Sequence, residues 1–205
     1  TPFPPEAKSD SMRFSVPKIA GVVVLTAIAT LVAVNLFSDG EKKITRRVEH
    51  QYDVASPQFL RSMGVLLGPP LVGGNRTQTL LNGDEIFPSM LQAIGSATKT
   101  IDFETYIYWS GRIGQSFADA LSERARAGVK VHILLDWVGS QKMDKAQLQQ
   151  MTDSGVDIRR YHPLQWYTID RVNNRTHRKL LVVDGRIGFT GGVGIGDEWN
   201  GHAQD

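Results

Sequence analysis

A histidine, a lysine and an aspartate, His177, Lys179 and Asp184, lie close together in the last part of the sequence. An imidazole can attack phosphorus as a nucleophile, and an ammonium group beside it can stabilise charge on phosphoryl oxygens. His177 and Lys179 are two residues apart, so both side chains project to one face if the backbone is extended. Gly191 and Gly192 follow, and such a pair leaves backbone N–H groups uncovered, as a phosphate cradle requires. The segment therefore predicts chemistry on a phosphate group.

The residues between these groups predict the structure that holds them. The apolar run 180–183 indicates a strand, and residues 186–190 indicate a second one. Asp184 and Gly185 between them are typical of a two-residue hairpin turn. We therefore expect a structural role for Asp184, although it belongs to the same motif.

The string His177-x-Lys179-x4-Asp184, followed by Gly191 and Gly192, resembles the HKD motif of the phospholipase D superfamily. It is most similar to the bacterial cardiolipin synthase-like branch, and the likeness extends over about residues 71–205. Further segments that share it are residues 80–84, 101–107 and 128–131.

This resemblance implies a phosphatidyltransferase or phosphodiesterase that works through a covalent phosphohistidine, without a metal or other cofactor. His177 matches the nucleophile or leaving-group acid, Lys179 the phosphate-binding lysine and Asp184 the motif aspartate. For Glu104, in an apolar strand, a substrate-side supporting role and a buried structural ion pair both remain open.

The sequence departs from the family in two respects. Relatives usually carry asparagine where this chain has Gly194. The family also builds one active site from two HKD motifs, in one chain or across a homodimer, and this sequence shows one. We expect the N-terminal half of a longer two-motif enzyme, with a homodimer as the alternative. Asp197 and Glu198 are candidates to replace the carboxylate that orients the motif histidine in relatives.

Alternating strand and helix patterns predict an α/β fold over residues 71–205, with a mixed sheet flanked by helices. The expected strands are residues 78–81, 100–108, 129–137 and 157–161, besides the two around the hairpin. The expected helices begin at Asp84 and cover residues 114–127 and 145–152.

An uncharged apolar stretch covers residues 19–37. As a helix it would extend about 28 Å, close to the ~30 Å of a bilayer core. It predicts a single N-terminal transmembrane anchor; the alternatives are a signal peptide and a buried core helix. Residues 1–18 are then a disordered tail and residues 38–70 a linker. Three basic residues precede the stretch and four follow it, so the side of the cell membrane stays open.

Composition excludes several classes of protein. The 23 basic and 21 acidic residues give a net charge of +2, which excludes a polybasic nucleic-acid arm. The absence of cysteine excludes disulfides, thiolate metal sites and a cysteine nucleophile.

We therefore expect a membrane-anchored phosphatidyltransferase that resembles cardiolipin synthase. Its expected partners are a phosphatidylglycerol-like phospholipid, the membrane and a second HKD motif, and nucleic acid is not expected. The alternatives are a phosphodiesterase acting on lipid or nucleic acid, and an inactive half-enzyme.

Overall fold

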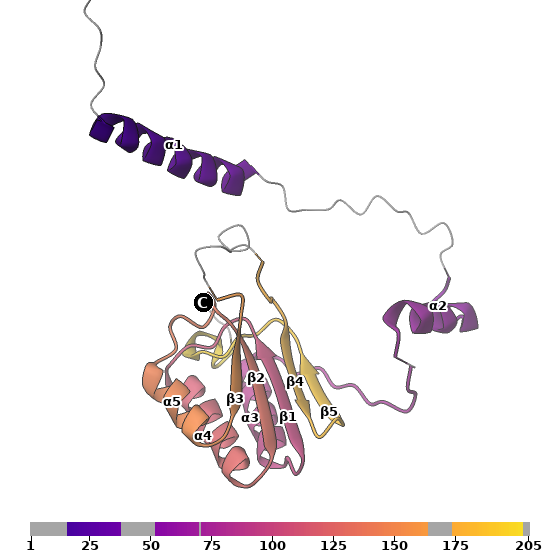
Figure 1. Ribbon diagram of the computed structural model, residues 1–205. Helices are drawn as coiled ribbons and strands as arrows, with labels where there is room; N and C mark the ends of the chain where they lie inside the picture. Colours follow the sequence, from indigo (N-terminus) through magenta and orange to yellow (C-terminus); the bar gives the residue numbers. More distant parts are fainter. Residues whose placement is uncertain (1–15, 38–51, 70, 164–173, 203–205) are drawn as a thin grey trace, which may run out of the picture. The chain divides into compact units, whose positions relative to one another are not determined.

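The computed structural model describes residues 16–37, 52–69, 71–163 and 174–202. The chain divides into two compact units, residues 1–71 and residues 72–205. Within the described residues, the first unit contains two helices, and the second contains a five-stranded sheet with three α-helices and one short 3₁₀ helix (Figure 1).

Helix α1 covers Val16–Phe37 and begins three residues before the predicted apolar stretch. Pro17 lies in its first turn, where the missing N–H has no partner to lose. The helix has no polar stripe, and residues 16–34 are exposed throughout. In the described part of the chain it is the one helix long and apolar enough to cross a membrane.

Helix α2, Pro57–Leu67, lies in the segment that we expected to be a linker. The Ser56 side chain accepts a hydrogen bond from the Gln58 N–H at 3.2 Å, and Pro57 occupies the first helical position. Gly68, with φ of 83°, ends the helix. These are ordinary helix start and stop signals, which a polar, proline- and glycine-rich setting obscured in the sequence.

The second unit is built on a sheet of order β3-β2-β1-β4-β5. Strands β1 (Thr100–Thr105), β2 (Lys130–Asp136) and β3 (Asp157–Tyr161) run parallel. Strand β4 (Lys179–Val183) is antiparallel to β1 and forms a hairpin with β5 (Ile187–Thr190). The mixed sheet is confirmed. The strand expected at residues 78–81 is absent, and this segment is irregular up to the start of α3.

Helices α3 (Asn82–Gly95), α4 (Arg112–Arg126) and α5 (Lys145–Asp153) pack against one face of this sheet. Helix α3 begins two residues before the predicted Asp84 and includes Asn82 and Gly83 in its first turn. A Cβ at Gly83 would lie 2.0 Å from the backbone oxygen of Trp199, so glycine permits this close approach. The strands contribute alternate residues to the core: Ile101, Phe103, Val131, Ile133, Leu135, Leu181 and Val183.

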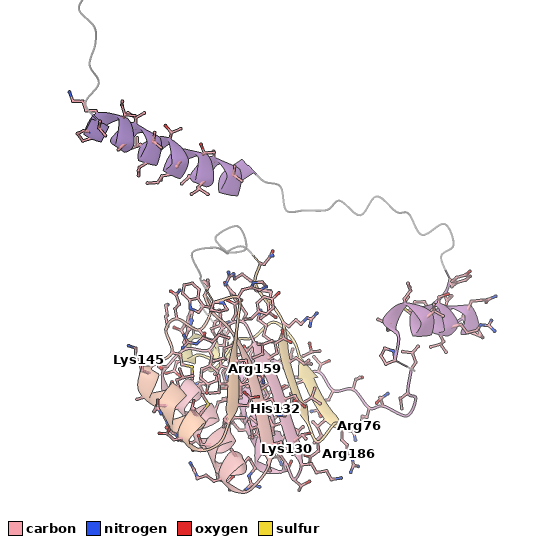
Figure 2. All side chains as sticks on the ribbon, viewed as in Figure 1. Arg76, Lys130, His132, Lys145, Arg159 and Arg186 are labelled. Carbon is pink, nitrogen blue, oxygen red and sulfur yellow. The ribbon has the colours of Figure 1, made fainter. Side chains whose placement is uncertain are left out.

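The opposite face of the sheet is open in the described structure. Its residues line a shallow pocket of about 510 Å³, and they include His132, Arg159, Glu104 and Leu180. Figure 2 shows His132 and Arg159 on this face, turned toward the viewer. The carboxyl ends of β1 and β2 and the amino end of β4 meet at the upper end of the sheet in Figure 1.

Candidate active site

His177 and Lys179 lie at the end of the sheet where β4 begins. Thr105, the last residue of β1, pairs with Lys179. The Lys179 Nζ is 3.1 Å from the His177 Nε2 and donates a hydrogen bond to the His177 carbonyl oxygen at 3.1 Å. His177 is exposed and Lys179 half-buried. The structure therefore brings together the imidazole and ammonium groups that the spacing predicted.

The environment of Lys179 affects its charge. Burial lowers the pKa of the Lys179 ammonium, because the charged form loses solvation. The ring of Tyr106 lies below it, with the Lys179 Nζ 5.5 Å from the ring centroid. The same ring is 5.0 Å from the His177 ring, centroid to centroid. Tyr106 thus contacts both groups, and sequence reasoning had not selected it, although it directly follows the β1 residues.

The glycine pair lies at the same end of the sheet. Leu180 pairs with Thr190, so Gly191 and Gly192 continue from β5 beside the start of β4. Both glycines are exposed, and a Cβ at either position would have no neighbour within 4 Å. Backbone at these positions is open to an approaching ligand, as the prediction of a phosphate cradle requires.

Asp184 lies at the other end of β4, separated from Lys179 by about 16 Å at 3.3 Å per residue. It occupies the left-handed region with φ of 52° in the hairpin turn. Its carboxylate accepts hydrogen bonds from the N–H groups of Thr98, Lys99 and Thr100 and from the Thr98 hydroxyl. The structure thus separates Asp184 from the other two motif residues, and its contacts join the turn to the start of β1.

Glu104 lies near the end of β1, and its side chain is 16% exposed. It accepts a hydrogen bond from the Thr176 hydroxyl, and its Oε2 is 3.8 Å from the Arg178 Nη1. Glu104 therefore contacts the residues on both sides of His177. These contacts are compatible with both expectations for Glu104, an ion pair and a supporting role beside the site.

Asp136, at the end of β2, is a residue that sequence reasoning missed. Its carboxylate is fully buried and accepts hydrogen bonds from the N–H groups of Val138, Gly139 and Thr176 at 2.9, 3.1 and 3.1 Å. The Arg175 Nη1 is 3.5 Å from the same carboxylate. An acidic residue at the carboxyl end of a buried strand was the available signal, because neighbouring parallel strands end at one edge.

Asp197 does not take the place of the carboxylate expected to orient His177. It accepts hydrogen bonds from the N–H groups of Arg112 and Ile113, at 3.0 and 2.7 Å, at the start of α4. These bonds, with the one from Ile113 the largest cause, lower the pKa of the Asp197 carboxyl. Asp197 is a helix cap. The neighbouring Glu198 is exposed.

The glycine at position 194 has a packing reason. Gly194 is buried, and a Cβ there would lie 2.8 Å from the Ile107 Cβ and 3.3 Å from the ring of Trp199. A larger side chain at position 194 would not fit beside Ile107 without a shift of the backbone.

No group of three or more histidine, aspartate or glutamate side chains is arranged to hold a metal ion within the described ranges. The groups at the site are an imidazole, an ammonium group and the exposed backbone of two glycines. Such a set suits attack on a phosphate ester.

Comparisons with known proteins agree with this chemistry. Residues 90–200 match the family described as "Cardiolipin synthase, PLD-like domain". The chain is 41% identical over 138 residues to cardiolipin synthase 1 of Bacillus anthracis, covering 67% of this chain and 27% of that protein. It is 35% identical over 165 residues to cardiolipin synthase 2 of Bacillus cereus, covering 80% and 31%. The chain thus spans about a third or less of the length of these relatives.

Among solved structures, it is similar to Nuc from Salmonella typhimurium, a phospholipase D family member. That likeness has 21% identity and a TM-score of 0.44, and it covers 58% of this chain and 68% of the other. The match to the family is the stronger finding, because it covers more than half of the 205 residues and includes both the His177–Lys179 pair and the whole sheet. The chain belongs to the cardiolipin synthase family with a phospholipase D-like domain.

Proposed function

We propose that this chain is the nucleophile-bearing half of a membrane-anchored phosphatidyltransferase that resembles cardiolipin synthase. The observation that carries the proposal is the 3.1 Å approach of Lys179 Nζ to His177 Nε2, at an exposed sheet end, in a member of this family. The Lys179 ammonium can leave the imidazole and bind a phosphoryl oxygen when substrate enters.

In the first step, the His177 Nε2 attacks the phosphorus of a phosphatidylglycerol-like diester. The bond from phosphorus to the headgroup oxygen breaks, and that oxygen takes a proton and leaves as glycerol. Lys179 and the N–H groups at Gly191 and Gly192 stabilise the charge on the other phosphoryl oxygens.

In the second step, the hydroxyl group of a second phosphatidylglycerol attacks the phosphohistidine. The phosphorus–nitrogen bond breaks, the hydroxyl proton passes to a base, and a cardiolipin-like product forms. The family resemblance supports a second motif histidine as the acid of the first step and the base of the second. That histidine would come from a further part of the protein or from a second copy of the chain.

The membrane part of the proposal is supported by α1. Its 22 residues extend about 33 Å at 1.5 Å per residue, enough for a ~30 Å hydrocarbon core. A lipid-embedded anchor would keep the site near substrates that do not leave the bilayer. The variant Val23→Cys tests the anchor, because the chain has no other cysteine. A fluorescent probe attached to this cysteine should be quenched by nitroxides on lipid tails if α1 crosses the membrane.

A hydrolase is the second candidate, and the exposure of His177 supports it. Water can reach the described side of the site, and water attack on the phosphohistidine would give phosphatidic acid. The two functions share the first step and differ in the acceptor.

The test of the shared step is covalent trapping. Protein containing this chain is mixed with vesicles of phosphatidylglycerol labelled on phosphorus, denatured in alkali and digested. Label on the peptide with His177, absent from the His177→Ala variant, is expected. Label that persists in that variant, or appears on another residue, would refute the proposed nucleophile.

A further inference from the structure

Thr176, directly before the proposed nucleophile, is held from two different strands. Its N–H donates to the Asp136 Oδ2 at 3.1 Å, and its hydroxyl donates to Glu104. Glu104 comes from β1 and Asp136 from β2. Thr176 is 7% exposed, whereas His177 beside it is exposed. The buried residue is therefore fixed, and the next residue in the chain reaches solvent.

The flanking arginines extend this arrangement on both sides of His177. The Arg175 Nη1 lies 3.5 Å from Asp136, and the Arg178 Nη1 lies 3.8 Å from Glu104. Each carboxylate thus contacts Thr176 and one arginine. Arg175 and Thr176 are both held by Asp136. The side chain of Arg178 is 79% exposed, and the side chain of His177 is available for substrate.

Asp136 is costly to bury, so the groups that pair with it are informative. Its carboxylate is 0% exposed, and a buried charge destabilises a fold unless it is well paired and hydrogen-bonded. Three backbone N–H groups and Arg175 surround it. Two of those N–H groups belong to the turn after β2, so Asp136 ties the nucleophile segment to that turn.

We propose that Glu104 and Asp136 form a positioning clamp on Thr176 that fixes the imidazole of His177 for attack. The inference rests on the proposed function, because it assigns the clamp to the nucleophilic step. Neither carboxylate touches the reacting atoms. Glu104 holds the side-chain hydroxyl of Thr176 and Asp136 holds its backbone N–H, and these two anchored groups leave the next residue little freedom. A nucleophile held within a fraction of an ångström reacts faster than one that rotates freely.

Thr176→Val removes the hydroxyl and keeps the size of the side chain. We expect kcat to fall about 10- to 100-fold, the range for lost support of a site residue. KM should stay within about twofold, because Thr176 does not contact the phosphate-binding groups.

The matched control is Thr98→Val. The Thr98 hydroxyl also donates to a carboxylate, that of Asp184 at 2.8 Å, but at the opposite end of β4. Both variants lose one hydroxyl–carboxylate bond, but Thr176 is buried and Thr98 is exposed, so the unfolding midpoint in urea should fall further in Thr176→Val. Activity per folded molecule should fall only in Thr176→Val. Equal activity losses in the two variants would overturn the clamp.

Combined variants test whether the two carboxylates act as one device. Glu104→Gln added to Thr176→Val should lower kcat little further, because both changes remove the same contact. Asp136→Asn added to Thr176→Val should lower kcat again, because Asp136 holds the N–H of Thr176. If Glu104→Gln and Asp136→Asn each lower kcat of Thr176→Val by the same further factor, the clamp does not consist of two separate contacts with Thr176.

A readout without turnover separates this inference from the proposed function. In micelles, the ring signals of His177 in nitrogen-15 spectra should shift or broaden in Thr176→Val and stay unchanged in Thr98→Val. If the wild-type protein forms no phosphohistidine, the proposed function fails and these spectra still decide the clamp. Unchanged His177 signals in Thr176→Val would refute it whatever the activity.

Discussion

Asp184 and His177 share a motif but experience opposite environments. His177 is exposed, whereas the Asp184 carboxylate accepts hydrogen bonds from three successive backbone N–H groups and a hydroxyl. These bonds, chiefly those from Thr100 and Thr98, hold the pKa of Asp184 well below its usual range. One end of β4 thus presents reactive groups, and the other fixes the strand in the sheet.

The first prediction concerns Asp184→Asn and pH. A depressed pKa in the folded state means that ionised Asp184 stabilises the fold above its unfolded pKa of about 3.9. This stabilisation is lost as the pH falls from there toward the lower folded pKa. The wild type should therefore unfold at higher urea than the variant at pH 6, and the gap should narrow below about pH 4. A gap independent of pH between 6 and 3 would contradict the role of the charge.

The second prediction concerns Gly194. Gly194→Ala places a methyl group 2.8 Å from the Ile107 Cβ and should destabilise the domain by about 1–3 kcal/mol, as overpacking does. Gly191→Ala is the matched control, because no atom lies within 4 Å of its added Cβ. Its free energy of unfolding in urea should stay within about 0.5 kcal/mol of the wild type. Similar losses at both positions would contradict the packing explanation.

At the scale of elements, periodicity predicted most of the domain. The predicted strand at residues 157–161 coincides with β3, and α4 and α5 differ from their predicted bounds by at most two residues. Of these elements, α4 has the clearest apolar face, with Ile113, Phe117 and Leu121 buried. The segment 78–81 has β-type residues but lies outside the sheet, and α2 depends on caps rather than on a long apolar pattern. Local sequence patterns do not reveal which segments pair with other strands in the sheet.

For the candidate site, the sequence predicted the neighbouring residues but not the contacts between distant segments. The His177–Lys179 pair could be found because residues two apart in an extended segment lie on one face, although β4 itself begins only at Lys179. The role of Asp136 could not be found in this way, because its partner Thr176 lies 40 residues later in the sequence and the two meet only when separate strands pair. Asp197 was misjudged for the same reason: its partners at the start of α4 lie about 85 residues earlier.

The third prediction concerns the cap on α4. Asp197→Ala removes the acceptor for the N–H groups of Arg112 and Ile113 and should cost about 0.5–2 kcal/mol of stability. Glu198→Ala removes the adjacent exposed carboxylate and should leave stability nearly unchanged. Thermal unfolding followed by circular dichroism measures both. Equal effects would contradict the cap.

At the scale of the molecule, the described domain is covered on one side only. Helices α3, α4 and α5 pack on one face, while residues such as Leu180, 39% exposed, lie on the other. Sheets with parallel strands are normally covered on both faces. The matches cover only 27% and 31% of the two relatives, and together with this the open face favours an active protein that contains more than the described domain.

The fourth prediction concerns the second HKD motif. This chain alone should form less phosphatidyl-His177 than the same chain supplied with a second HKD motif, because the leaving alkoxide lacks its proton donor. Single-turnover labelling at equal concentrations of folded chain measures the difference. Equal rates of labelling would mean that this chain, or a homodimer of it, already holds every group that the first step needs.

The most direct measurement compares the intact chain with His177→Ala in phosphatidylglycerol vesicles, each supplied with the second motif, and follows lipid products and free glycerol. We predict that cardiolipin and glycerol form in equal amounts and only when His177 is intact, while phosphatidic acid would indicate water as the acceptor. Product formed equally by the His177→Ala protein, or no product from either protein when both are folded, would contradict the assignment of His177 as the nucleophile of a phosphatidyltransferase.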